Sequence, residues 1–270
     1  MDKEISVFGA NGFIGSKFCE MYNDQIYIEP RESNVPKYDD VLYLISTTDN
    51  YNVFGDVHLD INTNLNKLMD VLPNVKGTFT FTSSWFVYGQ QHLPVKEDTH
   101  CNPTGFYSIT KKAAEDLLVS YCKTFNIKYR VLRLGNVYGK NDKGVSKKKN
   151  ALQFLIEEIK NNRDVNLYFG GDFLRDYIYI DDVCRAIKLC MEKGLINEII
   201  NVSNGRGYKF KTLIDFVVKE INSKSRVGIM EQPEFHKLVQ VRDMVLNTQK
   251  LESLGYKPEV DIYTGLKSLF

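Results

Sequence analysis

A tyrosine and a lysine lie four residues apart in the segment GFYSITKKAAEDLL, at Tyr107 and Lys111. In a helix this spacing puts the two side chains one turn apart on the same face. A nearby ammonium group favours the phenolate and lowers the tyrosine pKa from its usual value of about 10. Tyr107 is therefore a candidate acid/base for the exchange of a carbonyl and an alcohol. The alternative is a half-buried tyrosine beside a lysine whose ammonium group reaches water.

The same spacing recurs at Tyr263 and Lys267, so the spacing alone carries little information. The first pair differs because apolar residues follow it at helical intervals, namely Ala114, Leu117, Leu118, Tyr121, Cys122 and Phe125. This stripe predicts a helix that faces the core. A lysine at the head of such a stripe costs desolvation energy unless it has a partner or a role. We expect Tyr263 and Lys267 to lie on a surface helix near the C-terminus.

Three glycines at intervals of three follow a short apolar run in SVFGANGFIG. Residues 4–8 predict a strand, and a helix is expected from Ser16. A helix N-terminus offers free amides and a positive dipole end to a pyrophosphate. Gly9 would allow the tight turn, Gly12 the approach of phosphate, and Gly15 close helix–strand packing. A glycine turn without a ligand is the alternative, but its place at the first turn of an α/β chain favours a dinucleotide.

Apolar, β-rich runs alternate with helical patterns along the chain, as in EISVFG, QIYIE, DDVLYLIS, GTFTFTSS, KYRVLRLGN, VNLYF and EIINVSN. Near-continuous apolar strands between amphipathic helices predict a parallel sheet covered on both faces. We therefore expect a doubly wound α/β (Rossmann) fold. Residues 1–139 and 165–204 are assigned to the dinucleotide-binding domain. Residues 140–164 and 205–270, expected to form helices and loops, are assigned to a smaller C-terminal substrate-binding lobe at the carboxyl edge of the sheet.

The composition limits the possible classes of function. A net charge of +1 does not favour nucleic acid or an anionic membrane as a partner. No apolar run approaches the length of about 20 residues that a membrane helix needs. The five cysteines are scattered and lack the spacing of metal ligands. We expect a reduced, cytoplasmic protein without a structural metal.

Together, the glycine turn, the Tyr107–Lys111 pair and several further motifs resemble the extended short-chain dehydrogenase/reductase family. This group contains NAD(P)-dependent epimerases, dehydratases and ketoreductases of nucleotide sugars. The further motifs, in the order typical of the family, are SSWFVYG, RLGNVYGK, FGGDFLRDYIYIDDVCRAI, INVSNGRGYKF and NTQKLESLGYKPEVDIYTGL. The similarity covers nearly the whole chain.

The resemblance implies roles for individual residues. Tyr107 would be the acid/base, Lys111 would lower its pKa, and Ser84 would orient the reacting sugar oxygen. Ser84 could instead simply cap the turn after its strand. The implied cofactor contacts are Gly9, Asn11, Gly12, Phe13, Ile14, Gly15, Arg31, Ile45, Ser46, Tyr107 and Lys111. The implied substrate contacts are Ser84, Phe86, Asn136 and Arg175, with the Arg175 guanidinium on the diphosphate.

Two departures from the family pattern bear on the reaction. Dehydratases of the family carry an Asp-Glu pair where this chain has Trp85 and Phe86, which cannot exchange a proton. Dehydration is therefore not expected. The chain also runs from Ile28 almost directly to Val41 and lacks the strand and helix that usually lie there. We expect weaker binding of adenosine as a result.

The end of the second strand bears on the choice of cofactor. Glu29 suits the ribose 2′-hydroxyl of NAD, whereas Arg31 suits the 2′-phosphate of NADP. We expect NADP, with NAD as the alternative. A solvated Glu29–Arg31 pair without a cofactor role is also compatible with the sequence.

The sequence therefore predicts hydride transfer at a carbon of a nucleoside-diphosphate sugar, with reduction of a 4-keto sugar as the first choice. The alternative is an epimerase that retains its cofactor. A nucleotide-binding protein without catalysis is less favoured because Ser84, Tyr107 and Lys111 are all present. Family members often dimerise through the helix that bears the tyrosine, so a homodimer is also expected.

Overall fold

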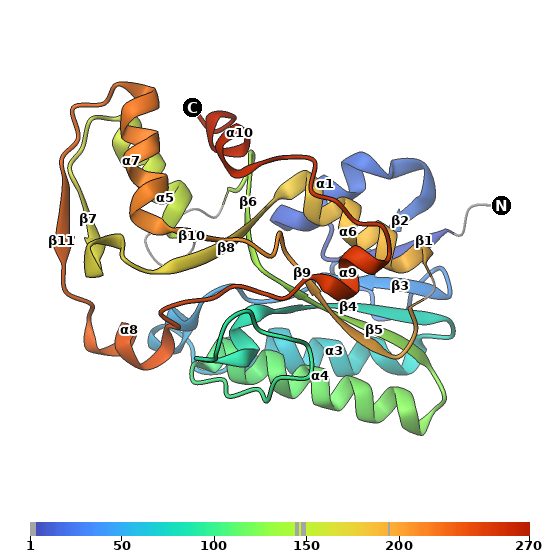
Figure 1. The fold of residues 1–270 in the computed structure, drawn as a ribbon. Coiled ribbons are helices and arrows are strands. Elements are labelled where there is room, and N and C mark those ends of the chain that lie inside the picture. Colours follow the sequence, from blue (N-terminus) through green and yellow to red (C-terminus); the bar gives the residue numbers. More distant parts are fainter. Residues whose placement is uncertain (1–3, 144–145, 147–149, 194) are drawn as a thin grey trace.

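A six-stranded parallel sheet forms the centre of the molecule (Figure 1). The structure is a computed structural model and describes residues 4–143, 146, 150–193 and 195–270. The strand order is β2-β1-β3-β4-β5-β9. These strands are β1 (Ile5–Phe8), β2 (Ile26–Ile28), β3 (Asp40–Tyr43), β4 (Thr78–Ser84), β5 (Lys128–Leu134) and β9 (Glu198–Val202). The predicted doubly wound α/β fold is confirmed.

Helices cover both faces of this sheet. On one face lie α1 (Phe13–Met21) and α6 (Ile180–Glu192), and on the other α3 (Lys67–Val71) and α4 (Phe106–Thr124) (Figure 1). Each residue of β4, whose sequence is TFTFTSS, is buried because both of its faces are covered. None of the helices in the described ranges has the length and apolar character needed to cross a membrane.

All six strands run in the same direction, so their carboxyl ends meet at one edge. β1 lies between β2 and β3, so the order of the strands reverses at this point. Ligands of open α/β sheets bind beside such a reversal. Ser46 follows β3, and Ser84 is the last residue of β4, which brings both hydroxyls to this edge.

The smaller lobe contains two further sheets and lies at the upper left of Figure 1. One sheet has the order β10-β8-β6, and the other pairs β11 with β7. Their strands are β6 (Asn136–Tyr138), β7 (Val165–Tyr168), β8 (Leu174–Tyr179), β10 (Gly207–Lys209) and β11 (Val227–Met230). The helices of the lobe are α5 (Ala151–Lys160), α7 (Phe210–Ile221), α8 (Glu234–Val239) and α10 (Ile262–Lys267).

Two expectations for this part of the chain were wrong. Residues 205–270 contain the strands β10 and β11, which are three and four residues long and too short to give a clear alternating pattern. The run VNLYF forms β7, which pairs with β11 and not with the central sheet. The division into domains stays a prediction. Because β7 and β8 both belong to sheets of the lobe, the structure favours a return to the larger domain after β8 over the return predicted at residue 165.

The remaining short elements connect the sheets. They are η1 (Asn23–Gln25), η2 (Asn50–Phe54), α2 (Leu59–Ile61), the π-helical η3 (Asn62–Asn66), η4 (Leu72–Asn74), η5 (Trp85–Tyr88), η6 (Phe169–Gly171) and α9 (Gln249–Ser253). Of these, η2, α2, η3 and η5 follow the carboxyl ends of β3 and β4 and so surround the region where ligands of this fold bind.

The predicted apolar stripe of α4 divides into two lines. Ala114, Leu118 and Cys122 are buried against the sheet, whereas Leu117 and Phe125 are 44% and 60% exposed. The two lines lie on different sides of the helix, and only the side on which Ala114, Leu118 and Cys122 recur every four residues faces the sheet. The exposed line is compatible with the predicted homodimer, which stays a prediction.

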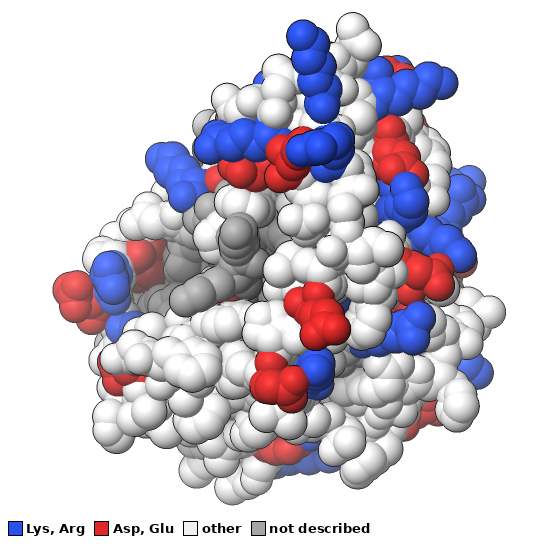
Figure 2. Space-filling view, turned by 90° about the vertical axis from the view of Figure 1, so that its left-hand side faces the viewer, with Lys and Arg blue, Asp and Glu red and all other residues white. Residues whose placement is uncertain are grey.

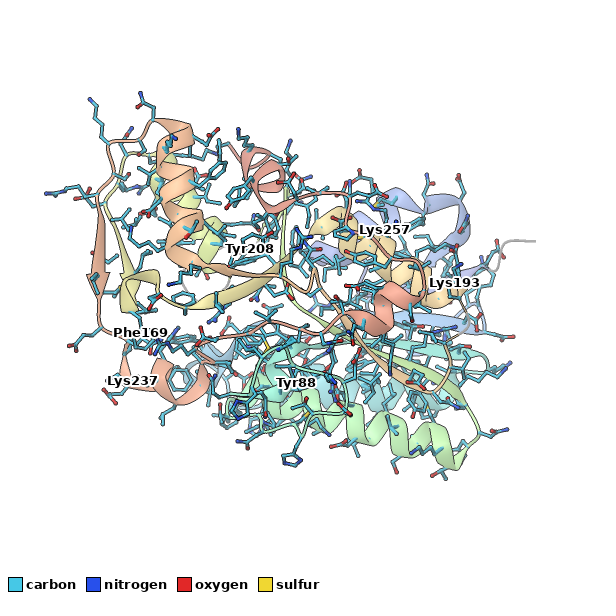
Figure 3. All side chains as sticks on the ribbon, viewed as in Figure 1. Tyr88, Phe169, Lys193, Tyr208, Lys237 and Lys257 are labelled. Atoms are coloured by element: carbon cyan, nitrogen blue, oxygen red, sulfur yellow. The ribbon has the colours of Figure 1, made fainter. Side chains whose placement is uncertain are left out.

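A buried ion pair fixes α4 to β5. Arg133 Nη2 lies 2.7 Å from Glu115 Oε2, and the two side chains are 3% and 2% exposed. Arg133 also donates to the carbonyl of Glu97 at 3.2 Å, and its guanidinium lies 4.6 Å from the centre of the Tyr88 ring. The Tyr88 hydroxyl donates to Asn201 Oδ1 on β9 at 2.7 Å (Tyr88 is labelled in Figure 3). These contacts set the position of the helix that carries Tyr107.

We expect Glu115→Ala to destabilise the protein by about 3–5 kcal/mol, because it leaves Arg133 buried without its partner. Asp116→Ala is the matched control, since Asp116 pairs with Lys112 at the surface of the same helix. Denaturant unfolding followed by circular dichroism gives both values. Similar losses in the two variants would contradict the assigned role of the buried pair.

Candidate functional site

A cavity of about 510 Å³ lies at the carboxyl edge of the sheet, between the six-stranded domain and the smaller lobe. Its walls come from the glycine turn, the ends of β3 and β4, the first turns of α4, and from β7, β8 and α8 of the lobe. Figure 2 shows the side of the molecule on which β11 and α8 lie. Lys and Arg gather on the upper part of this side, over the lobe, and the lower part is largely uncharged.

The three glycines of the first turn meet different constraints. Gly9 has a φ of +86°, and a Cβ there would lie 2.9 Å from the Ile45 nitrogen. A Cβ on Gly15 would lie 2.2 Å from the Gly9 oxygen, so packing within the chain explains both residues. A Cβ on Gly12 would meet nothing closer than 3.4 Å. The protein itself therefore leaves space beside Gly12, as expected if a phosphate approaches it.

The helix after this turn begins at Phe13 and not at the predicted Ser16. Gly12 is its N-cap and has no side chain to bond the amides of the first turn. Two further polar atoms of the cavity wall, Asn50 Oδ1 and Ser83 Oγ, are buried without a hydrogen-bond partner among the described residues. Free amides beside orphaned polar atoms fit a ligand with a pyrophosphate and several hydrogen-bonding groups, such as a nicotinamide dinucleotide.

Ser84, Tyr107 and Lys111 all line the cavity. Lys111 is 1% exposed, and its Nζ donates to the Thr82 carbonyl at 2.7 Å. The same nitrogen lies 4.2 Å from the centre of the Phe81 ring. Burial lowers the pKa of Lys111 to about 7, against a smaller opposing effect of Glu115.

Burial raises the pKa of the Tyr107 phenol, and the charge of Asp60 adds to the rise. The hydroxyls of Ser84 and Ser46 act in the opposite direction as hydrogen-bond neighbours. The sequence-based expectation that Lys111 lowers this pKa is not what the structure shows. The physical reason is that Lys111 is itself desolvated, so its charged form is disfavoured near neutral pH.

Ser84 also has a local structural role. Its Oγ accepts a hydrogen bond from the Phe86 amide at 3.3 Å and so caps η5. The rings of Trp85 and Phe86 stack with their centres 3.9 Å apart. Phe86 then meets the Tyr107 ring edge to face at 6.1 Å. The two aromatic residues thus form an apolar wall beside the phenol.

The predicted substrate contacts Asn136 and Arg175 line the cavity but are already hydrogen-bonded to the protein. Asn136 Nδ2 donates to the Asp176 carbonyl at 2.9 Å. The Arg175 guanidinium donates to the carbonyls of Val241, at 2.8 Å, and Arg242. Arg175 therefore anchors the segment before α9 as well as facing the site.

The predicted cofactor residues divide into two groups. Those of the cavity wall are Gly9, Gly12, Phe13, Ile14, Gly15, Ser46, Tyr107 and Lys111. Asn11, Arg31 and Ile45 are described but do not belong to the wall, and the first two are exposed.

Glu29 is buried and its Oε1 accepts from Ser6 Oγ at 2.7 Å and from the Lys37 amide at 2.6 Å. Its carboxylate thus holds the short loop between β2 and β3.

The sequence analysis did not single out an aromatic contact across the cavity. The Tyr51 hydroxyl lies 3.0 Å from His236 Nδ1, joining η2 of the larger domain to α8 of the lobe. Phe235 and Tyr168 surround this pair, with ring centres 5.0 Å from Tyr51 and 4.6 Å from His236. Burial, and then the charge of Arg175, lower the pKa of His236 to about 4, so the imidazole is neutral at pH 7. A lone histidine so far along the chain gave no signal in the sequence.

In Figure 1, α8 lies at the lower left of the molecule, beside the blue segment around residue 50. Phe169 and Lys237, both labelled in Figure 3, lie at this same end. Lys237 is half exposed and pairs with Glu234 on its own helix. His236, the preceding residue, belongs to the cavity wall.

Comparison with known families identifies the class of protein. The model of the NAD dependent epimerase/dehydratase family matches residues 37–203, which is more than half of the 270-residue chain. The chain therefore belongs to this family and is an NAD(P)-dependent enzyme, as the motifs predicted. This class covers epimerases, dehydratases and reductases that act on nucleotide sugars.

Two relatives illustrate the range of the family. A putative UDP-glucose 4-epimerase of Methanocaldococcus jannaschii is 29% identical over 79% of this chain and 68% of its own length. A dTDP-4-dehydro-6-deoxyglucose reductase of Escherichia coli is 26% identical over 70% of this chain. The chain matches 58% of the length of that reductase.

Solved structures share the fold along almost the entire chain. UDP-glucose 4-epimerase of Thermotoga maritima, solved with UDP-glucose, has a TM-score of 0.87 and 24% identity over 98% of this chain and 97% of its own. The protein RMD of Pseudomonas aeruginosa, solved with NADPH, has a TM-score of 0.84 and 22% identity over 99% of this chain and 97% of its own. At these identities the likeness concerns the fold alone.

The lowered pKa of Lys111 leads to a prediction about stability. The unfolded state binds this proton up to a pKa of about 10.4, but the folded state releases it near pH 7, so stability should rise with pH between these values. We expect Lys111→Met to reduce the gain in unfolding free energy between pH 7 and pH 9 by on the order of 1–2 kcal/mol. Denaturant unfolding at both pH values measures the gain. Lys112→Met is the control, and an unchanged gain in Lys111→Met would refute the assignment.

Proposed function

We propose that this enzyme uses a reduced nicotinamide cofactor to convert a keto group of a nucleoside-diphosphate sugar into an alcohol. The observation that carries the proposal is the arrangement of Ser84 and Tyr107 around one cavity that also contains the glycine turn. A phenol whose pKa is raised by burial stays protonated at neutral pH and suits the donation of a proton.

The proposed chemistry follows from this arrangement. Ser84 and Tyr107 donate hydrogen bonds to the carbonyl oxygen of the sugar and polarise it. The reduced nicotinamide, when bound, supplies the hydride for the carbonyl carbon. Tyr107 gives its proton to the oxygen, and the product is the alcohol. Tyr107 is then protonated again from solvent.

In this proposal Lys111 is a positioning residue. Its hydrogen bond to the Thr82 carbonyl joins the first turns of α4 to the strand that ends in Ser84. The hydroxyls of Ser84 and Tyr107, which polarise the carbonyl, are therefore held in fixed positions relative to each other. The ammonium group is also available to the hydroxyls of a bound cofactor.

The substrate class rests on the lobe side of the cavity and on the relatives. Asn136 and Arg175 face the site from β6 and β8, where an amide and a guanidinium suit sugar hydroxyls and phosphates. The names of both relatives refer to sugars carried on nucleotides. Trp85 and Phe86 offer no carboxylate beside Ser84, which argues against the elimination of water.

We propose NADPH as the cofactor. Glu29 is engaged by Ser6 and the Lys37 amide, whereas Arg31 is exposed in the same loop and could reach a 2′-phosphate. The loop from 29 to 39 contains no helix or strand, and this shortened wall favours a cofactor that exchanges at each turnover.

Epimerisation is the second candidate. It is favoured by the name of the archaeal relative, which is 29% identical over 79% of this chain. An epimerase would first oxidise an alcohol, with Tyr107 as base, and then reduce the keto sugar from its other face.

We expect purified protein to oxidise NADPH when 4-keto-6-deoxy sugar nucleotides are added, as followed by the absorbance of the reduced nicotinamide. Tyr107→Phe should lower turnover by about hundredfold or more, because the proton donor is lost, and leave cofactor binding nearly intact. Tyr263→Phe, which alters a tyrosine with the same spacing to a lysine on the surface helix α10, should have no effect. Interconversion of sugars without net oxidation would instead identify an epimerase.

Arg31→Ala should weaken NADPH binding about tenfold or more, because a charged hydrogen bond to the 2′-phosphate is lost, and should change NADH binding little. Fluorescence titration of each reduced cofactor measures both dissociation constants. Arg206→Ala, at an exposed arginine of the lobe, is the control. Equal losses for the two cofactors would remove Arg31 from the choice between them.

A further inference from the structure

A buried carboxylate lies behind the site without belonging to its wall. Asp60, on α2, is 1% exposed. Its Oδ1 accepts hydrogen bonds from Thr47 Oγ1 and, at 3.1 Å, from Asn52 Nδ2. Both partners are neutral, and the described residues contain no cation paired with Asp60. A buried carboxylate is costly in such a place, so its presence calls for a physical reason.

Asp60 sets the direction of the hydrogen bonds that lead from it. A carboxylate only accepts, so the Thr47 hydroxyl must give its hydrogen to Asp60. Thr47 Oγ1 then accepts from Asn64 Nδ2 at 2.8 Å. The carboxamide orientation of Asn64 is fixed a second time, because the Thr47 amide donates to Asn64 Oδ1 at 2.9 Å.

The hydrogen-bond direction that Asp60 sets also fixes the hydroxyl of Ser46, which lies beside Tyr107. The Ser46 hydroxyl is directed to Asn64 Oδ1, at 3.2 Å, and to the Thr47 carbonyl, at 2.6 Å. Both atoms can only accept, so the hydrogen of Ser46 points to them and its lone pairs remain for the phenol. Ser46 can thus accept a hydrogen bond from protonated Tyr107. It can donate to a phenolate only by giving up these bonds.

Ser84 differs from Ser46 in this respect. Its Oγ accepts from the Phe86 amide, and its own hydrogen is free of the backbone and can be given to the neighbouring Tyr107 oxygen. That hydrogen can turn toward the carbonyl oxygen of a substrate. The two serines therefore have different roles, one as an acceptor for Tyr107 and the other as a donor to the substrate.

The same network holds the turn of α4 that carries Tyr107. Asn64 Nδ2 also donates to Thr110 Oγ1 at 2.9 Å, and Thr110 Oγ1 donates to the carbonyl of Tyr107 at 3.1 Å. Asn64 lies in the π-helical segment η3, between α2 and α3. Single π-helical turns of this kind are frequent at functional sites.

We propose that Asp60 and Asn64 are positioning residues that hold Ser46 as a hydrogen-bond acceptor and thereby keep Tyr107 in its protonated form. This inference rests on the proposed role of Tyr107 and deepens it. A protonated phenol can begin the reduction of a carbonyl, whereas epimerisation begins with the removal of a proton from an alcohol. The network thus favours reduction over epimerisation.

Other charged or titratable groups surround the phenol. Lys111 lies on α4, and the cavity wall adds Asp49, Asp142, Tyr168, Arg175, Tyr177 and His236. Burial and the charge of Asp60 raise the pKa of Tyr107. Ser46 lowers this pKa only as a donor to the phenol oxygen, and its hydrogen is instead directed to Asn64 Oδ1 and the Thr47 carbonyl.

The test is the ionisation of Tyr107 in Asp60→Asn, measured without any reaction. The ultraviolet absorbance of tyrosinate is followed against pH for each variant with and without Tyr107→Phe, and the difference reports Tyr107 alone. We expect the acid dissociation constant of Tyr107 to increase about tenfold, because the charge and the obligatory acceptor are both removed. Asp56→Asn, at an exposed aspartate four residues before Asp60, should leave it unchanged.

A second variant, Thr47→Val, provides the test if Asp60→Asn does not fold. It keeps the carboxylate and removes the hydroxyl that connects Asp60 to Asn64, so a smaller shift in the same direction is expected. Circular dichroism establishes that each variant is folded. An unchanged titration of Tyr107 in the folded variants would overturn the proposal.

The pH profile of the reaction separates this inference from the proposed function. Reduction requires the protonated phenol, so its rate falls as pH rises through the pKa of Tyr107, and Asp60→Asn should move this fall to lower pH. A wild-type protein that oxidises no reduced cofactor would refute the proposed function and leave the titration as the test of the network. A reductase whose pH profile and titration are both unaffected by Asp60→Asn would refute the network alone.

Discussion

The hydrogen bond from Lys111 Nζ to the Thr82 carbonyl is the contact on which the geometry of the site depends. It ties the first turns of α4 to the end of β4, so that a residue of the helix and a residue of the strand face the same cavity. A buried ammonium group without such an acceptor would not be tolerated. The Arg133–Glu115 pair secures the same helix one turn further along, against β5. The relative position of the Ser84 and Tyr107 side chains is therefore fixed by the anchoring of α4 to β4 and β5.

Features encoded by short segments could be predicted from the sequence. The glycine turn, the place of Tyr107 and Lys111 at the start of one core-facing helix, and the place of Ser84 at a strand end each depend on about 20 consecutive residues or fewer. The contacts that were missed join distant segments. Tyr51 meets His236 across 185 positions of the chain, and Asn64 reaches Thr110 across 46. A periodic pattern carries no information about such pairs, because it describes which face of an element is buried and not what lies opposite.

The pKa of Tyr107 shows why residue types alone were insufficient. Spacing indicated an ammonium group near a phenol, and an exposed pair of this kind would lower the tyrosine pKa. Burial changes the result, since it disfavours the charged form of both groups. Part of the burial of Tyr107 comes from the aromatic wall of Trp85 and Phe86, which precedes the helix in the chain.

Tyr51 belongs to the larger domain and His236 to the lobe, so their contact links the width of the cavity to the relative position of these two parts. Phe54 packs against Phe235 beside it and is 68% exposed, so part of this junction faces solvent. A ligand that entered between η2 and α8 would have to separate these rings, so the strength of their contact would bear on how fast the cavity admits and releases it.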